Sequence, residues 1–364
     1  MPGKSHGDRA GVTGADPRDA SAGEPRSIAR TGRRRLSLTT FSAFRVVSFR
    51  WFFASTVSGT LGYQMQSVAL GWLVYLLTGS ALYLGIITTA QAVCQTAVSP
   101  LAGVIADRVE RRTYIMLVRS ITVGVAVALA VLVVTNRVTY LDLVVGAAIL
   151  GIAFGLNGPA RQALMAQLVG NDLLMNAVSL TSGGMNFMRI VGPAVAGYLI
   201  GVIGVGGIYI LLAILYSAVI VELIPVPPQP VELRQDPKNV LSDLLTGLSY
   251  SYHKPAVFGL LLFGTVPLFF AMPYIALLPI FAENVWHSGA EGFGLLSAAP
   301  GVGGLVGALV VASLGSYRYK GRLMIACAAA YGAFLAAFAL APSFQLALFF
   351  LLLSGGASVI NTAS

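Results

Sequence analysis

Long apolar runs, separated by short polar gaps, cover most of the chain beyond residue 50. Each run is close to the ~20 residues that an α-helix needs to cross the hydrocarbon core of a bilayer. The ten runs have the approximate limits 51–77, 81–106, 113–134, 140–158, 177–203, 205–224, 257–282, 292–314, 323–341 and 345–364. This pattern predicts an all-α membrane protein with ten transmembrane helices.

Two polar stretches divide the chain. Residues 1–44 are rich in Gly, Ser, Asp and Arg and lack a helical apolar period, so we predict a disordered cytoplasmic tail. The Pro-rich stretch 225–256 cannot form a continuous helix, and it predicts a cytoplasmic linker. The chain then has an N-terminal six-helix half at 45–224 and an incomplete C-terminal half at 257–364, which holds the seventh to tenth helices.

The composition excludes several classes of protein. Hydrophobic residues make up 56% of the chain and charged residues 10%, whereas charged residues make up ~25% of soluble domains. So few charges cannot cover the surface of a soluble enzyme of this size. The two cysteines, Cys94 and Cys327, both lie inside apolar runs, and two cysteines cannot build a disulfide scaffold.

The distribution of the basic residues predicts the orientation. Ten of the 23 Lys and Arg lie in the first 50 residues, and no basic stripe is interleaved with aromatic residues, which argues against nucleic-acid binding. Most of the others fall in polar gaps on one side. In this assignment Arg119 belongs to the start of the third helix and Arg161 to the gap after the fourth. Only Arg137 lies on the opposite side, so the N-terminus is predicted to be cytoplasmic.

The loop between the second and third helices carries the most diagnostic residues. They combine a glycine with an Asp-Arg pair and two further arginines: Gly103, Asp107, Arg108, Arg111 and Arg112. On these residues the sequence resembles the major facilitator superfamily, twelve-helix secondary transporters made of two six-helix halves. The resemblance implies that this loop gates the transporter. The alternative is a plain positive-inside anchor, which needs neither the aspartate nor the glycine.

Two departures from the family pattern matter. Glu110 stands where the family usually has glycine, which puts the tight turn of the loop in question. The second half stops at its fourth helix, so ten of the twelve helices that the family implies are expected. The chain is then either a fragment or the product of a gene truncated by about two helices, since two of the family's twelve are not accounted for.

A second match lies in the fifth helix, 177–203. Its small residues and its proline follow the Gly-rich, Gly-Pro pattern of the exporter branch: Gly183, Gly192, Pro193 and Gly197. Small residues predict close helix packing, and the proline predicts a kink. Together with the segment 157–164, this match narrows the resemblance to the branch that includes the bacterial enterobactin exporter and the transmembrane secretion effectors.

Polar residues at helical spacing predict a substrate path through the bundle. The candidates come from the first, second and fifth helices: Gln64, Gln91, Gln95, Asn186 and Arg189. A charged side chain inside a membrane helix costs about 2.5–3.5 kcal/mol on insertion scales, so Arg189 should face a cavity or a partner. The alternative is that these groups only tie helices together. An electropositive path would suit anionic or catecholate-like substrates.

The resemblance implies a secondary active transporter in the plasma membrane that exports a small organic molecule, such as a siderophore, drug or secondary metabolite, by alternating access. Protons are the candidate coupling ion, and a monomer is expected. The three histidines lie in the tail or in loops, and no metal-ligand spacing occurs, so no enzyme, metal or cofactor is expected. The alternative is a non-transporting receptor or assembly protein, or an inactive truncated permease.

Overall fold

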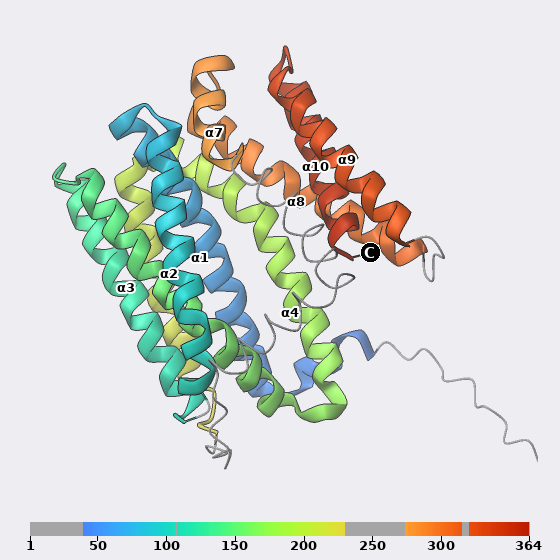
Figure 1. Ribbon diagram of the computed structural model, residues 1–364. Coiled ribbons are helices and arrows are strands. Elements are labelled where there is room, and N and C mark those ends of the chain that lie inside the picture. The colour runs from blue at the N-terminus through green and yellow to red at the C-terminus, as the bar shows by residue number, and fades with distance from the viewer. Residues whose placement is uncertain (1–38, 107, 230–273, 315–319, 364) are drawn as a thin grey trace, which may run out of the picture. The chain divides into compact units, whose positions relative to one another are not determined.

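Helices make up the described part of the chain. The computed structural model describes residues 39–106, 108–229, 274–314 and 320–363, and no strand occurs in these ranges, which confirms the predicted all-α class. The α-helices are α1 (Val47–Thr78), α2 (Ala81–Ala106), α3 (Arg111–Val134), α4 (Tyr140–Leu223), α7 (Tyr274–Ile280), α8 (Gly289–Leu314), α9 (Lys320–Ala339) and α10 (Phe344–Ala363) (Figure 1). A 3-10 helix, η1 (Thr39–Arg45), precedes α1, and a π-helical turn, η2 (Phe281–Val285), follows α7.

The long helix α4 contains three of the predicted helices. Its backbone leaves the helical region at Gly170 (φ 67°, ψ 175°) and at Gly204 (φ 70°, ψ 174°), conformations that glycine adopts without steric cost. We therefore call residues 140–169 α4a, residues 171–203 α4b and residues 205–223 α4c. The predicted end of the fourth helix at residue 158 is wrong, because the helix continues through Pro159 to the break at Gly170.

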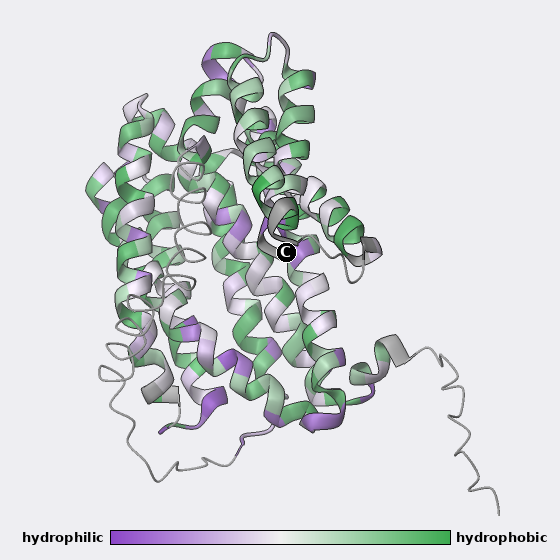
Figure 2. Ribbon diagram, turned by 45° about the vertical axis from the view of Figure 1, so that its right-hand side comes forward, coloured by the Kyte–Doolittle hydropathy of each residue, from purple (hydrophilic) through white to green (hydrophobic). Residues whose placement is uncertain are grey.

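Length and composition suit these helices to a bilayer. Within the described ranges, five helices are long and apolar enough to span a membrane, namely α2, α3, α4, α8 and α10. Large apolar side chains point outward from them; Leu117, Ile214 and Leu309 are each more than 60% exposed. Figure 2 shows this hydrophobic colouring along the helices. The count of ten spans stays a prediction, since residues 230–273 lie outside the described residues.

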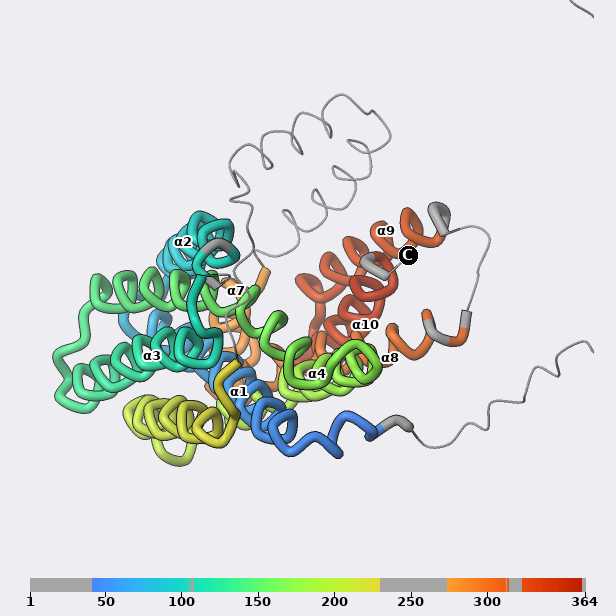
Figure 3. The backbone as a smooth tube through the Cα atoms, turned by 90° about the horizontal axis from the view of Figure 1, so that it is seen from below, coloured from blue at the N-terminus to red at the C-terminus, as the bar shows by residue number. Residues whose placement is uncertain are grey.

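Glycines bring α4b and α8 into backbone contact. A Cβ added at Gly197 would lie 2.7 Å from the Cα of Gly294, and one added at Gly294 would lie 2.6 Å from the carbonyl oxygen of Pro193. Further along the same contact, Gly301 faces Ile190. Figure 3 shows α4 and α8 side by side. Because small residues let helix backbones approach, this seam joins the N-terminal half to the C-terminal one.

Apolar contacts between the two halves gather at one end of the bundle. One buried cluster includes residues from both halves, such as Trp72, Leu278, Phe293 and Leu351. In α1 this cluster uses residues 65–74, near the C-terminal end of the helix. The second buried cluster uses the opposite end of α1, and all of its described members lie between residues 43 and 226.

The start of α3 and the end of α4c hold each other. The Nε–H of Arg112 donates to the carbonyl of Leu223 over 3.1 Å, and its Nη2–H donates to the carbonyl of Ile224 over 2.8 Å. Carbonyls at a helix C-terminus have no partner within the helix and carry partial negative charge. Arg112 therefore caps α4c from a neighbouring helix.

Glu110 caps α3 beside this contact. Its carboxylate accepts hydrogen bonds from the backbone N–H groups of Arg112 (3.0 Å), Thr113 (2.7 Å) and Gln229 (3.3 Å). Partial burial raises the pKa of the Glu110 carboxyl, but the hydrogen bonds from Thr113, Arg112 and Gln229 outweigh it and leave the pKa below its ordinary value. The φ of Glu110 is −62°, so the turn needs no glycine here, which answers the question raised by the family pattern.

Substitution of a glycine in the seam tests the contact between α4b and α8. Gly197→Val should lower the free energy of unfolding by about 1–3 kcal/mol, because its side chain would overlap the backbone of α8. Thermal unfolding of the purified protein in detergent measures this change. Gly201→Val is the matched control, since a Cβ at Gly201 meets no atom within 4 Å. Equal melting of the two variants would contradict the seam.

The Glu110 cap predicts a pH dependence. Glu110→Ala should cost about 0.5–2 kcal/mol of stability at neutral pH, because it leaves three N–H groups without their acceptor. A carboxyl with a lowered folded pKa stabilises above its unfolded pKa, and this contribution is lost as the pH falls through the folded pKa. The difference from the wild type should thus shrink in acid, as unfolding measured in a pH series would show. The exposed Arg108 serves as control, and Arg108→Ala should match the wild type throughout.

Candidate functional site

Polar contacts concentrate where α1 meets α4c. The hydroxyl of Tyr216 donates to Gln66 Oε1 over 2.6 Å, and both side chains are buried. Nearer the start of α1, the hydroxyl of Ser58 donates to Glu222 Oε1 over 3.0 Å. Gly62 leaves room for the Tyr216 ring, which a Cβ would approach to 2.7 Å. These polar side chains satisfy one another between helices, as they must where lipid offers no hydrogen bonds.

Arg119 is a buried cation that the sequence analysis did not single out. The structure places it within α3, eight residues after Arg111, where it is only 6% exposed and not part of a polar gap. Its guanidinium lies against α1 at Gly59, where a Cβ would come within 2.9 Å of Nη2. Arg161, which the sequence analysis assigned to the gap after the fourth helix, lies within α4a and is half-buried. The sequence did carry a signal for the burial of Arg119, because this residue lies inside the apolar run 113–134.

Two of the predicted path residues, Gln64 and Arg189, lie where α1 meets α4b. The Cβ of Gln64 lies 2.6 Å from a Cβ added at Gly192, so Gln64 lies where α1 contacts α4b. Arg189 lies close enough to Tyr63 of α1 to interact with it electrostatically. The Tyr63 ring stands edge-on to Phe154 of α4a, with centroids 4.4 Å apart. Side chains of three helix segments thus meet around Tyr63.

The remaining path residues are exposed or half-buried. Asn186 is exposed on α4b, as is Arg189 itself. Gln91 is half-buried and Gln95 is exposed on α2, and their backbone carbonyls, rather than their amides, face glycines of α4a. In the described part of the chain, no hydrogen bond joins any two of the five predicted path residues.

The four predicted packing residues differ in their surroundings. Gly192 and Pro193 are buried, with Gly192 against Gln64 of α1. Gly197 is buried against α8. Gly183 is exposed, and a Cβ added there would meet no atom within 4 Å.

The predicted gating loop is described only in part. Asp107 lies outside the described residues. Gly103 is half-buried with open space around a Cβ, and Arg108 is exposed. Arg111 is the first residue of α3, and Arg112 caps α4c.

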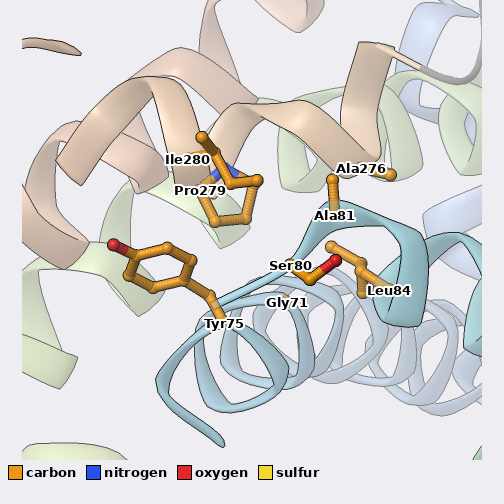
Figure 4. A pocket seen from close by; sticks show the side chains of 8 residues that line it. All are labelled: Gly71, Tyr75, Ser80, Ala81, Leu84, Ala276, Pro279 and Ile280. Atoms are coloured by element: carbon orange, nitrogen blue, oxygen red, sulfur yellow. The ribbon is translucent and has the colours of Figure 1, made fainter. Parts of the chain in front are cut away.

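At the opposite end of α1, one hydrogen bond connects the two halves. The hydroxyl of Tyr75 donates to Asn284 Oδ1 of η2 over 2.6 Å. Beside it lies a shallow, apolar recess that is too narrow for a water molecule (Figure 4). Its lining comes from α1, α2 and α7, the turn between α1 and α2 included: Gly71, Tyr75, Ser80, Ala81, Leu84, Ala276, Pro279 and Ile280. The two halves are therefore in direct contact here.

Known transporters resemble this chain in sequence. The enterobactin exporter EntS of Citrobacter koseri is 30% identical over 338 residues, which cover 89% of this chain and 76% of that protein. The staphyloferrin A transporter of Staphylococcus aureus is 26% identical over 276 residues, which cover 74% of this chain and 68% of that protein.

Solved structures show the same fold. The nucleoside transporter NupG superposes with a TM-score of 0.67 at 13% identity, covering 87% of this chain and 80% of its own. An inward-facing bacterial homologue of the human lysosomal transporter Spinster superposes with a TM-score of 0.65 at 15% identity, covering 87% of this chain and 73% of its own. The family model described as "Transmembrane secretion effector" matches residues 38–364. The chain therefore belongs to this family of major facilitator transporters, multi-pass proteins of the inner membrane that carry small molecules and are not enzymes.

Proposed function

We propose that this protein exports a small organic molecule by alternating access. The observation that supports this proposal is the uneven contact between the two halves. Buried residues of both halves meet at the C-terminal end of α1, whereas the cluster at the other end contains only residues of the N-terminal half among those described. With the N-terminus in the cytoplasm, the contact lies on the outer side, so the transporter faces inward.

The relatives support the direction and the class of cargo. Proteins named as an enterobactin exporter and a staphyloferrin A transporter match most of this chain, so we propose export of a siderophore or a similar metabolite. We further propose that the chain has ten transmembrane helices of a twelve-helix plan. They form two halves, 45–224 and 257–364, joined by the linker 225–256 and preceded by the tail 1–44. We also propose that the protein is a monomer and that protons are the coupling ion.

We propose that the substrate path runs past the meeting point around Tyr63. Arg189 supplies positive charge there, with Gln64 nearby and with Gln91, Gln95 and Asn186 as further polar groups. Gly183, Gly192, Pro193 and Gly197 are proposed to shape α4b. The loop that holds Gly103, Asp107, Arg108, Arg111 and Arg112 is proposed to gate the cytoplasmic side, and its described arginine contact already links α3 to the end of α4c.

Cross-linking at the outer contact tests alternating access. Tyr75→Cys with Asn284→Cys, joined by a short bis-methanethiosulfonate reagent in a protein lacking Cys94 and Cys327, should abolish efflux, because the halves could no longer separate there. Reductant should restore efflux. Export from cells loaded with a catecholate siderophore provides the measurement.

The matched control lies within one half. The hydroxyl of Tyr140 donates to the carbonyl of Tyr83 over 3.1 Å, and the two rings are 4.9 Å apart. Cross-linking Tyr83→Cys to Tyr140→Cys should leave efflux intact, since both residues move together. Normal efflux with the outer cross-link in place would contradict the proposal.

Substitution of Arg189 tests the path. Arg189→Lys keeps the charge but loses the planar guanidinium, so efflux of an anionic substrate should fall by about tenfold while expression stays normal. Arg189→Leu should insert normally and lose efflux. Arg137→Leu, at an exposed arginine between α3 and α4, is the control. Loss of the protein in Arg189→Leu, with normal efflux per molecule in Arg189→Lys, would instead indicate a packing role.

A further inference from the structure

Two arginines lie inside neighbouring helices of the N-terminal half, α3 and α4a, which contact each other where the Tyr114 hydroxyl donates to the carbonyl of Leu156 over 3.3 Å. Arg119 stands eight residues from the start of α3, and Arg161 stands nine residues before the break at Gly170. The two guanidinium groups are close enough to repel each other electrostatically.

No acidic side chain in the described ranges forms an ion pair with Arg119. The Tyr216 hydroxyl, on the neighbouring α4c, already donates its proton to Gln66. The Nε–H of Arg119 is buried without a hydrogen-bond partner. A buried cation that lacks an acceptor is costly in the bilayer interior, so the site favours a ligand that supplies negative charge.

Asn157, next to Leu156 at the contact with α3, provides a second unpartnered donor. It is 6% exposed, and its Nδ2–H group is buried without a partner. Asn157 precedes Arg161 by four residues, which places both on one face of α4a. Buried donors at Asn157 and Arg119, with Arg161 in the same region, lack an acceptor oxygen.

We propose that Arg119, Arg161 and Asn157 form a binding site for an oxyanion, most simply the carboxylate of a small organic acid. Guanidinium groups match the planar oxygens of a carboxylate, and the amide donates a further hydrogen bond. The site differs from the path around Arg189, which lies on α4b. It is a binding property of the folded protein and does not require the proposed export.

The chain's own Glu222 is the internal competitor for this site. Its Oε1 accepts a hydrogen bond from Ser58, and its Oε2 is buried without a partner. Ser58 is next to Gly59, against which the Arg119 guanidinium lies. If Glu222 served as the anion, added oxyanions would not bind until it was replaced by glutamine.

Titration of the purified protein in detergent tests the site. Citrate or sulfate is added at constant ionic strength against chloride, and binding is followed by calorimetry. We expect saturable binding that weakens by about 10- to 100-fold in Arg119→Gln and in Arg161→Gln, as the loss of a charge-assisted hydrogen bond predicts. Tighter binding of citrate than of sulfate identifies an organic acid as the ligand, and the reverse order identifies a free inorganic anion.

A control variant keeps the result decisive. Arg137→Gln should bind like the wild type, since this exposed arginine belongs to neither the oxyanion site nor the proposed path. If Arg119→Gln fails to fold, Arg161→Gln gives the same measurement at a half-buried position. Absence of saturable binding in the wild type, binding that appears only in Glu222→Gln, or unchanged binding in Arg161→Gln would each overturn the proposal. Efflux is measured separately, so a failed site leaves the export proposal standing.

Discussion

A charged side chain inside a membrane bundle must be covered by protein, and the covering of Arg119 by α1 sets the packing of the N-terminal half. The guanidinium occupies space that exists only because residue 59 is glycine. One turn further along α1, Gly62 receives the Tyr216 ring in the same way. The close approach of α1 to α3 and α4c therefore depends on two small residues and on polar groups that satisfy one another across the gap.

Two kinds of contact join the two halves, one between helix backbones and one between side chains. The seam of Gly197 and Gly294 brings backbones together with little side-chain volume between them, so it can persist while the helices tilt. The contact at the end of α1 is made instead by aromatic and apolar side chains and by the hydrogen bond from Tyr75 to Asn284. Such a contact can separate as a unit, because few backbone groups depend on it.

Hydropathy predicted most of the fold, because long apolar runs leave helices as the only way to satisfy the backbone in lipid. It placed the break at Gly204 between two runs correctly, but it ended the fourth helix at Gly158-Pro159. A proline within a membrane helix removes one hydrogen bond without ending the helix, whereas the positive φ at Gly170 does reverse the chain.

The candidate site was harder to predict than the fold. Counting basic residues for orientation treated Arg119 as a charge at the start of the third helix and Arg161 as a charge in the gap after the fourth, although both lie well inside helices. The partners of Arg112 at Leu223 and Ile224 are more than 110 residues away in sequence, so no local pattern could indicate them. The capping role of Glu110 had a local signal, an acidic residue directly before a helix, but the family pattern directed attention to the missing glycine.

Two arginines lie beside α1, and a third interacts with one of them, an arrangement that bears on the proposed transport. Arg119 lies against Gly59, Arg189 lies near Tyr63, and Arg161 interacts with Arg119. They come from α3, α4b and α4a, so a shift of α1 changes the surroundings of more than one of them at once. Because the free energy of a buried cation depends steeply on its neighbours, an anion bound among these helices would favour one position of α1 over another. Binding of an anionic cargo could in this way be coupled to the movement that carries it.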